Sequence, residues 1–578
     1  MAEQFDVIVV GTGWNGLIGA KTYLDFAPTA KLVLLDEQSS IGGVWSKEKI
    51  YPNLYAQIKY GQFEYSFYPM RKEGITSDGY ISGETINRYL SDFASDYDLV
   101  RRTRFRTKVV RVERLGEGAG WRLEIEGQPA IECAKLIYAS GATSHPVIPS
   151  YANSGFQAPV MHSSETGMHL EALEKIQTAT VVGAAKSAYD TVFLLLKAGK
   201  KVNWVIRQEG SGPLALMPPT ILGLFNTMDA VATRMVGLLG SSIMNKQGRL
   251  HRFLHQTLVG QTVTKTFWAT LNLIADTHAG YSLSANANKL RPLPYGNGIF
   301  WANAGLGAAS VPDFWKVFHA GDCTVHRTEI ESLGEDNVVK LRDGSSFATD
   351  YIVLCTGFDK SYHPFAGDLQ RSLGLAPDPS EQAKWGAMEA EAAAEVDSAL
   401  PAIQQPPLPR PHHDEKGKTG PAHGPSRHYR RLVVPSLVAQ GDRSIYFPGF
   451  IHSIYTPLVS ESQALWGVTF LLGLQDHDLP SQAEMESEVA TWTVWSRKRY
   501  MVQGRKHAYA IYDFLSYVDT LLRDLGVDMT GKRNLLQELL QPVYPRDYRG
   551  LVDEYRRVQL LEQLRRLGGA AAGAGEGR

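Results

Sequence analysis

The sequence predicts an α/β protein built from sheets and helices in three layers, with two Rossmann-like dinucleotide-binding domains, the second inserted into the first. A buried strand, a glycine turn, a helix and another buried strand occur twice, beginning at residues 6 and 180. Each set is a βαβ unit. In addition, "AKLIYASGAT" and "FATDYIVLCTGFD" share one pattern, a buried strand that runs into a glycine turn.

The composition indicates a globular protein that binds a small molecule. A chain of 578 residues has room for two to four domains, and 44% hydrophobic residues are ample for their cores. Lys and Arg number 59 against 60 Asp and Glu, so the net charge is -1. No overall field therefore favours nucleic acid or an anionic membrane as partner.

Three cysteines, Cys133, Cys323 and Cys355, are too few and too far apart for a disulfide framework, a zinc ribbon or a redox pair. We therefore expect a reducing, cytoplasmic location and no metal. The acidic start "MAEQFD" does not resemble a signal peptide. The long uncharged stretch 210–228 holds three prolines and three glycines, so we expect no membrane segment there.

The first unit consists of strand "DVIVV", helix "WNGLIGAKTYLDF" and strand "KLVLLD". After it, "GETINRYLSDFASDYDL" predicts an amphipathic helix, and "FRTKVVRVER" and "WRLEIEG" predict strands of a hairpin or meander. The second unit consists of strand "TVV", helix "SAYDTVFLLLKAG" and strand "KVNWVI".

The rest of the chain gives the expected domain boundaries. Residues 213–305 are apolar and rich in Gly, Pro and aromatics, and we expect helices that cover a pocket. From Phe347 we expect the chain to return to the first sheet. The expected parts are 1–165, first part of the first dinucleotide-binding domain; 166–345, second dinucleotide-binding domain; 346–375 and 431–565, second part of the first domain with C-terminal helices; 376–430, flexible insertion; and 566–578, disordered tail.

The first turn has the full context of a dinucleotide-binding fingerprint. Gly11, Gly13 and Gly16 follow a strand and open a helix, and Asp36 ends the next strand. These positions supply a tight turn, close approach to a pyrophosphate at a helix N-terminus, and an acid for a ribose hydroxyl. Glu37 is a second candidate for the ribose. A chance glycine-rich turn is the alternative.

The second turn, residues 183–188, keeps only its first glycine. Ala185 adds a methyl group where a pyrophosphate would approach most closely. However, Arg207 follows the second strand where an acid would bind a ribose hydroxyl, and a guanidinium suits the 2′-phosphate of NADPH. We therefore expect FAD in the first turn and a transiently bound NADPH in the second. A structural βαβ unit with a surface arginine is the alternative.

With both turns placed, the chain resembles the flavin-containing monooxygenase superfamily, including its Baeyer-Villiger relatives. "IGGVW" is similar to the family's flavin-contacting segment, and "YPNLYAQIKY" to its "YPxLxTNxSK" stretch. "ASG" and "CTGF" resemble its paired crossovers, and "FPGFIHSIYTPLVSESQALW" its late block. The match runs from residue 5 to about residue 530.

The resemblance implies which residues contact the cofactors. The candidates for catalysis are Gln57, which is to hydrogen-bond the oxygenated flavin or the NADP+ amide, and then Lys59 and Tyr60. The candidates for cofactor binding are Gly11, Gly13, Trp14, Asn15, Gly16, Asp36, Glu37, Gly43, Val44, Trp45, Val109, Ala139, Ser140, Gly141, Gly183, Ala184, Ala185, Lys186, Ser187, Ala188, Arg207, Thr356 and Gly357. Simple packing is the alternative for Gln57.

The resemblance also implies the reaction. NADPH reduces FAD, O2 adds to the reduced ring, and a C4a-(hydro)peroxyflavin gives one oxygen atom to a small organic substrate, in specialised metabolism. Such sites exclude water. The alternatives are a Baeyer-Villiger monooxygenase and a non-catalytic dinucleotide-binding redox sensor; a disulfide reductase would need paired cysteines. Substrate identity and oligomeric state are not predicted.

Two departures from the family pattern favour oxygenation of a heteroatom or an electron-rich carbon. The linker fingerprint FxGxxxHxxxW appears with Ala158 and Thr166 in place of its glycine and aromatic residue. Near His319, where Baeyer-Villiger enzymes place an arginine, this chain has none. An arginine that entered the active site from the 213–305 segment would instead favour the Baeyer-Villiger alternative. The candidates for such an arginine are Arg234, Arg249 and Arg291.

Overall fold

In the computed structural model, residues 2–573 are described except 117, 209, 247, 309–312, 408–425, 476–478 and 530–533. The first sheet has the order β5-β2-β1-β8-β7-β6, and β24 pairs with β8. Its strands are β1 (Glu3–Val10), β2 (Leu32–Leu35), β5 (Thr103–Arg104), β6 (Val109–Arg114), β7 (Trp121–Ile125), β8 (Gln128–Tyr138) and β24 (Ile445–Tyr446). The predicted amphipathic helix and the antiparallel β6–β7 pair are confirmed, the helix as α2 (Gly83–Asp96).

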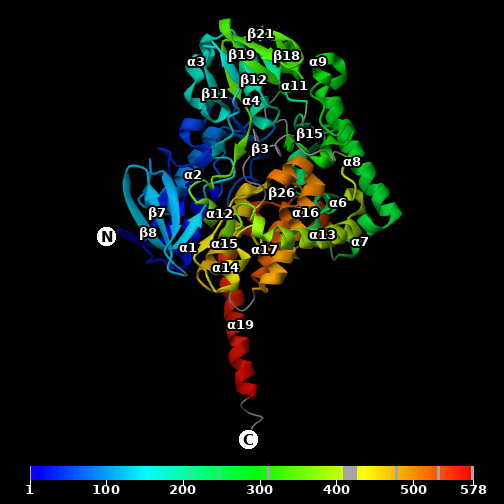
Figure 1. The fold of residues 1–578 in the computed structure, drawn as a ribbon. Helices are drawn as coiled ribbons and strands as arrows, with labels where there is room; N and C mark the ends of the chain where they lie inside the picture. The colour runs from blue at the N-terminus through cyan, green and yellow to red at the C-terminus, as the bar shows by residue number, and fades with distance from the viewer. Residues whose placement is uncertain are drawn as a thin grey trace.

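The second sheet is parallel throughout and lies at the top of the molecule in Figure 1, above the first sheet. Its order is β11-β22-β12-β13-β18. The strands are β11 (Val160–His162), β22 (Tyr351–Leu354), β12 (Thr178–Val182), β13 (Lys201–Val205) and β18 (Cys323–His326). A smaller sheet beside it joins β10 (Ala152–Ser154), β19 (Ile330–Gly334), β20 (Val338–Leu341) and β21 (Ser346–Ala348).

The expected return to the first sheet near residue 346 is wrong. Strand β22 pairs with β11 and β12 of the second sheet, and both β10 and β11 precede residue 166. The second unit therefore starts earlier and ends later than 166–345. A buried strand that ends in a glycine turn has the same pattern in either sheet, so the pattern does not reveal its partner. The chain returns to the first sheet at Phe365, which forms a parallel bridge with Val112 of β6, and then at β24.

The two passes of chain between the units are paired with each other. Strand β9 (His145–Pro146) leaves the first unit and β23 (Phe358–Asp359) comes back to it, and the two form an antiparallel pair. The connection is therefore a two-stranded ribbon.

The 213–305 segment forms two short pairs of strands and a set of helices on the right of Figure 1. β14 (Ala215–Met217) pairs with β17 (Leu306–Ala308), and β15 (Thr220–Ile221) forms a hairpin with β16 (Phe225–Asn226). The helices are α5 (Thr227–Val231), α6 (Arg234–Leu239), α7 (Arg249–Gln256), α8 (Leu258–Ala279), α9 (Ala285–Asn288) and α10 (Gly298–Trp301).

Two neighbouring chain segments differ from expectation. Within the expected flexible insertion 376–430, the structure forms helix α13 (Gln382–Ala399), which packs on α16 (Gln482–Lys506). The prediction was wrong for this part, because its Ala-rich and Glu-rich sequence is a strong helix former and only the neighbouring part is Pro-rich. Within the expected tail 566–578, α19 (Leu551–Gly573) continues as a helix, and residues 574–578 lie outside the described part.

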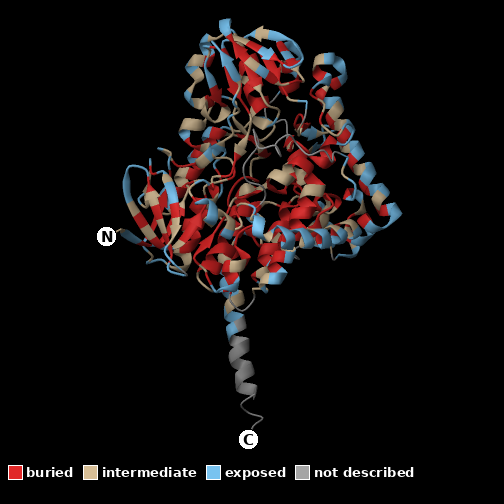
Figure 2. Ribbon diagram, viewed as in Figure 1, coloured by how far each residue is buried: buried red, intermediate tan, exposed pale blue. Residues whose placement is uncertain are grey.

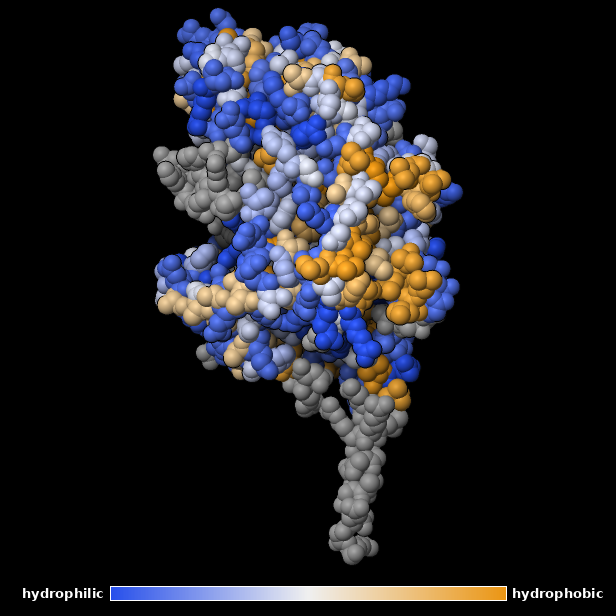
Figure 3. Space-filling model, turned by 90° about the vertical axis from the view of Figure 1, so that its right-hand side faces the viewer, coloured by the Kyte–Doolittle hydropathy of each residue, from blue (hydrophilic) through white to orange (hydrophobic). Residues whose placement is uncertain are grey.

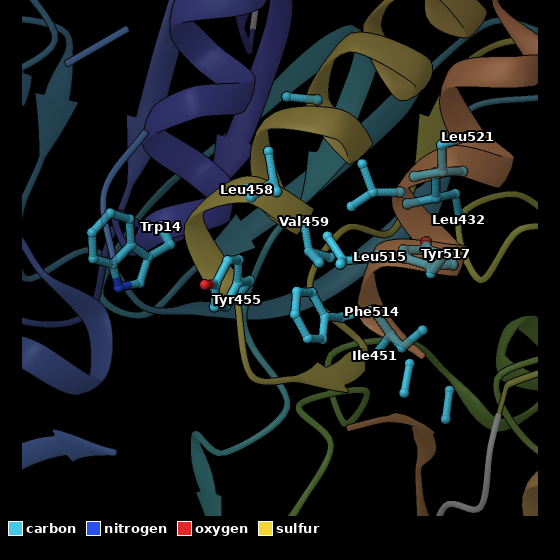
Figure 4. Packing of buried hydrophobic residues seen from close by; sticks show 14 of the residues in the cluster. Trp14, Leu432, Ile451, Tyr455, Leu458, Val459, Phe514, Leu515, Tyr517 and Leu521 are labelled. Atoms are coloured by element: carbon cyan, nitrogen blue, oxygen red, sulfur yellow. The ribbon is translucent and has the colours of Figure 1, made fainter. Parts of the chain in front are cut away.

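The core is continuous between the first sheet and the C-terminal helices (Figure 2). Helix α15 (Thr456–Leu471) is buried along its length and lies between α1 (Trp14–Phe26) and α17 (Phe514–Asp524). Figure 4 shows Val459 of α15 beside Phe514 and Leu515. In the described part of the chain, no helix is long and apolar enough to cross a membrane.

The remaining elements complete the layers around these sheets. They are β3 (Tyr55–Lys59), β4 (Tyr80–Ser82), β25 (Ile451–Ser453), β26 (Ala508–Ala510), α3 (Leu170–Lys175), α4 (Lys186–Lys197), α11 (Phe314–Ala320), α12 (Gly367–Ser372), α14 (Pro435–Ala439) and α18 (Leu535–Leu540).

Candidate active site

Packing within the chain requires the outer two glycines of the first turn. Gly11 has a φ of 104°, and a Cβ built on it would lie 2.5 Å from the carbonyl oxygen of Ala139. A Cβ on Gly16 would lie 1.9 Å from the carbonyl oxygen of Gly11. Helix α1 therefore sits directly on the turn, as the sequence pattern predicts.

The middle glycine is different, because nothing in the chain requires it. Gly13 is the N-cap of α1 with an ordinary φ of -82°, and a Cβ built on it would come no closer than 3.7 Å to any heavy atom. The first N–H groups of a helix have no partner within the helix and attract anions. Open space at this glycine, in front of the helix N-terminus, fits the pyrophosphate of a dinucleotide.

The two acids after β2 have different surroundings. The buried carboxylate of Asp36 accepts hydrogen bonds from the Thr12 amide (2.8 Å), the Thr12 hydroxyl (2.6 Å) and the Gln38 amide (2.9 Å). Asp36 therefore stabilises the turn through its hydrogen bonds to Thr12. Glu37 is exposed and lines the large cavity described below, so its carboxylate faces the space for a ligand.

The segment after these acids packs against the first turn. The Gly42 amide donates to the Thr12 carbonyl at 3.2 Å, and a Cβ on Gly43 would lie 3.2 Å from the Cα of Gly13. Val44 and Trp45 then line the cavity. "IGGVW" thus lies between the first turn and the cavity.

The two residues after Gly13 have different surroundings. Trp14 is buried among Phe63, Tyr65 and Tyr89. The Asn15 Oδ1 atom is buried without a hydrogen-bond partner among the described residues. A buried acceptor of this kind needs a donor from a ligand or water.

The second turn has the same backbone as the first. Gly183 has a φ of 126°, and its Cβ would lie 2.1 Å from the carbonyl oxygen of Cys355. Ala185 is the N-cap of α4 with a φ of -92° and is exposed, so its methyl group points into open space. Ala188 is buried, and α4 accommodates its Cβ.

The start of α4 is tied to the first unit by a cluster of three polar side chains. The Lys186 ammonium pairs with Asp190 and also donates to the Tyr55 carbonyl at 3.1 Å. The Tyr51 hydroxyl donates to Asp190 at 3.0 Å. Burial raises the pKa of Asp190, and Lys186 opposes this. Tyr51 and Asp190 were not predicted from the sequence, although the single acid in the apolar run "YDTVFLLL" was a signal.

One cavity of about 600 Å³ lies between the two units. Both contribute to its walls. From the predicted set, the lining includes Glu37, Val44, Trp45, Gln57, Lys186 and Ser187; further lining residues are Lys49, Tyr51, Phe63, Asp190, Met217, Thr227, Met228, Val231, Leu306, Phe358, Ser453, Ile454, Thr456 and Ile511. The poorly patterned 213–305 segment supplies four of these, and periodicity alone did not single them out.

Only one of the three catalytic candidates lines this cavity. Gln57 does, and its Nε2 atom lies 2.5 Å from where a Cβ on Gly307 would be. Lys59 instead pairs with Asp229 at 2.6 Å, and the Tyr60 hydroxyl donates to the Met70 carbonyl at 2.9 Å. These partners hold Lys59 and Tyr60, and neither residue is part of the cavity lining.

The second of the paired crossovers contacts a buried histidine. The Ala139–Gly141 crossover follows β8, and Gly357 follows β22. The His162 Nε2 atom lies 3.1 Å from the Gly357 carbonyl, and burial lowers the pKa of His162. The Thr356 hydroxyl donates to the Val147 carbonyl at 2.5 Å.

Three predicted residues lie at the edges of the site. Val109 begins β6 and is half-buried, and Ala184 accepts the Leu214 amide at 2.9 Å through its carbonyl. Arg207 lies two residues after the end of β13, near Tyr151. Burial raises the pKa of Tyr151 to about 12, and the positive charge of Arg207 opposes part of this rise.

The three arginines named above do not line the cavity. Arg234 pairs with Asp519 and Glu538, Arg291 pairs with Asp276 at 2.6 Å, and Arg249 is exposed. In the described part of the chain, the cations of the lining are Lys49 and Lys186. No group of three His, Cys, Asp or Glu side chains there is arranged to hold a metal.

Comparison with known proteins gives close relatives. The model of the pyridine nucleotide-disulphide oxidoreductase family matches residues 55–227. The FAD-dependent monooxygenase DEP4 of Alternaria brassicicola is 48% identical, with 98% of both chains covered. The FAD-dependent monooxygenase resA of Aspergillus sclerotiorum is 35% identical over 97% of this chain and 100% of its own.

Solved structures with the same fold are also found. An oxidized steroid monooxygenase bound to NADP matches with a TM-score of 0.58 and 16% identity, over 90% of this chain and 97% of its own. An open form of cyclohexanone monooxygenase matches with a TM-score of 0.56 and 15% identity, over 90% and 98% of the two chains. The predicted α/β fold with two Rossmann-like domains is thereby confirmed.

Proposed function

The chain belongs to the FAD-dependent monooxygenases, and from this premise we propose that it oxygenates a small organic substrate in the cavity between its units, using NADPH and O2. The membership confirms the predicted resemblance, the enzyme class and the two cofactors. The observation that carries the site assignment is that residues beside both turns, Trp45 and Lys186 among them, line one cavity.

The residues of the first turn would hold the FAD. Gly13 leaves room for a pyrophosphate, Glu37 faces the space for the ribose, and Asn15 has a buried acceptor without a partner in the described part of the chain. When bound, the flavin supplies the acceptor for hydride from NADPH and the reaction with O2. Asp36 would act indirectly, by holding Thr12 and the shape of the turn.

The residues of the second turn would hold NADPH. The N-terminus of α4 is directed to the pyrophosphate, and Arg207 would pair with the 2′-phosphate. The exposed methyl group of Ala185 narrows this approach relative to Gly13, which suits a ligand that is released in each cycle. Lys186, held by Asp190 and the Tyr55 carbonyl, places a positive charge beside the same position.

The cavity walls would exclude water and orient the substrate. Met217, Met228 and Val231 give the wall from the 213–305 segment an apolar surface, and apolar walls keep a reactive site dry. The Gln57 amide offers a donor and an acceptor to the reacting groups. We assign it as the catalytic residue in contact with substrate and cofactor.

The surroundings favour transfer of oxygen to a heteroatom or an electron-rich carbon. A positive arginine beside the reacting oxygen favours attack on a carbonyl, because it stabilises an anion in a dry site. In the described part of the chain no arginine lines the cavity. Lys49 and Lys186 do line it, so a Baeyer-Villiger reaction is the second candidate. A non-catalytic redox sensor is a third, because it would share the turns.

One purified sample tests these alternatives. We expect bound flavin, NADPH consumption, and one labelled oxygen atom from 18O2 in the product of an amine, a thioether or an electron-rich aromatic. Conversion of ketones to esters or lactones with little activity on the others would instead support the Baeyer-Villiger candidate. Bound flavin with no NADPH consumption in the presence of this substrate panel would support the sensor.

A further inference from the structure

Helix α8 has a solvent-exposed face with almost no charge. Its exposed residues are Leu258, Val259, Thr262, Val263, Lys265, Thr266, Ala269, Thr270, Leu273, Thr277 and His278. Leu258 is 84% exposed and Leu273 is 66% exposed, although they lie four turns apart. Surface helices normally carry charged residues on their outer face, so this face differs from an ordinary solvated one.

The threonines on this face already have hydrogen-bond partners within the helix. The hydroxyl groups of Thr262, Thr270 and Thr277 donate to the carbonyl groups four residues earlier, at 2.8 Å, 2.9 Å and 2.8 Å. Their hydrogens therefore need no water, and their methyl groups add to the apolar area. Such a bond to the i−4 carbonyl satisfies a threonine hydroxyl without solvent.

The β15–β16 hairpin is a second exposed apolar feature, and it directly precedes residues of the cavity wall. The tip of the β15–β16 hairpin carries Leu222, Leu224 and Phe225, which are 74%, 76% and 64% exposed. Thr227 and Met228, directly after the hairpin, line the cavity. Figure 3, which views the side where α7 and α8 lie, shows several hydrophobic areas on this face with hydrophilic ones between them.

The charges at the base of α8 are of one sign. Between residues 248 and 279 the sequence has one acid, Asp276, and this pairs with Arg291. Lys246 pairs with Glu395. Arg249, Arg252 and Lys265 are exposed and have no ion pair among the described residues. The nearly neutral net charge of the whole chain conceals this local excess.

We propose that the exposed faces of α7 and α8, with the β15–β16 hairpin, bind the surface of an anionic lipid bilayer. Exposed leucine, valine and phenylalanine side chains would enter the interface, and Arg249, Arg252 and Lys265 would contact lipid phosphates. The protein would lie on the membrane without crossing it. The inference goes beyond the proposed oxygenation and does not depend on it.

A second copy of the chain fits this surface less well. In a symmetric dimer the same patch contacts itself, so the unpaired cations around it would face one another. A bilayer with acidic headgroups supplies the opposite charge. The hairpin tip also offers three protruding side chains, as expected for insertion between headgroups.

Co-sedimentation of the purified full-length holoenzyme with vesicles tests the proposal. We expect binding to vesicles of phosphatidylcholine with phosphatidylserine, weaker binding to phosphatidylcholine alone, and a loss of binding at high salt. Replacing Arg249, Arg252 and Lys265 by Gln should weaken binding by about fivefold per charge. Leu258→Asp with Val263→Asp should weaken it at least about tenfold.

A matched pair of changes controls for the added charge. Val110 and Leu115 are 42% and 41% exposed on the first sheet, away from α8, so Val110→Asp with Leu115→Asp should leave vesicle binding unchanged. Flavin content and unfolding show whether each variant is folded. Absence of vesicle binding, or binding that the α8 changes leave intact, overturns the proposal. A dimer in light scattering that the α8 changes dissociate, without vesicle binding, assigns the surface to a second copy.

Discussion

The two glycine turns share a backbone but differ in how the chain holds them. In both, the first glycine donates its amide to the end of a neighbouring strand, Gly11 to Leu35 at 2.8 Å and Gly183 to Val205 at 3.0 Å. In both, its missing Cβ leaves room for a carbonyl group of a crossover, that of Ala139 or Cys355.

The differences are in the helices and the bracing. Helix α1 lies so close to its turn that Gly16 admits no Cβ, whereas α4 admits Ala188. Asp36 and Gly42 brace the first turn from within its own unit. The second turn is held across to the other unit, through Tyr51 and Lys186. A rigid site suits a retained ligand, and a site between units suits one that comes and goes.

The largest expected effect comes from closing the tight gap in the first turn. Gly16→Ala puts a Cβ 1.9 Å from the Gly11 carbonyl oxygen, so α1 must move. We expect a loss of about 3 kcal/mol or more in the free energy of unfolding, measured with urea. Ala188→Gly at the matching position should cost only about 0.5–1 kcal/mol. Equally small losses of unfolding free energy in the two variants would show that α1 and α4 lie equally close to their turns.

The middle position of each turn, Gly13 or Ala185, tests ligand binding separately from packing within the chain. Gly13→Val has room in the chain itself, yet it fills the path of a pyrophosphate, so the purified protein should lose most of its flavin and its yellow colour. Its unfolding free energy, measured without flavin, should change by less than about 1 kcal/mol. Ala185→Gly should leave flavin content unchanged. A full complement of FAD in Gly13→Val would mean that this turn does not hold the cofactor.

The next largest effect is expected at the end of the second strand of each βαβ unit, where Arg207 follows β13 and an acid follows β2. Arg207→Gln should raise the KM for NADPH about ten to a hundredfold, because a charged contact of about 1.5–3 kcal/mol is lost, and should leave the KM for NADH nearly unchanged. Steady-state kinetics with both nucleotides measures this. Equal weakening of both would show that Arg207 acts on their common part or on folding.

The smallest expected effect concerns the cluster that holds the second turn. Tyr51→Phe removes a donor from Asp190 and should cost about 1 kcal/mol of unfolding free energy at neutral pH. Because burial raises the pKa of Asp190 in the folded protein, stability falls as pH rises from the unfolded pKa toward the folded one. The Tyr51 bond lowers that pKa, so the variant should lose more stability with rising pH than the native protein.

Urea unfolding across this pH range measures the difference between the two proteins. Adding Asp190→Asn should abolish the extra loss, because the titrating group is gone. If the pH dependence of Tyr51→Phe persists in the double variant, another group is responsible.

The sequence predicted the parts of the site that are local in the chain. The turns at Gly11 and Gly183, and the segment ending in Trp45, follow from short patterns with one physical cause each. The partner of β22 and the helix α13 were missed, the first because strand pairing is a long-range property and the second because of its Pro-rich neighbour. Met217 and Met228 reach the cavity through tertiary packing, which periodicity does not encode.

The ribbon of β9 and β23 has a mechanical consequence. Both passes of the chain between the units run through this ribbon, so its two strands must bend together if the units shift relative to each other. Such a shift would also have to break the hydrogen bonds from Lys186 to the Tyr55 carbonyl and from Tyr51 to Asp190, which join the units beside the cavity.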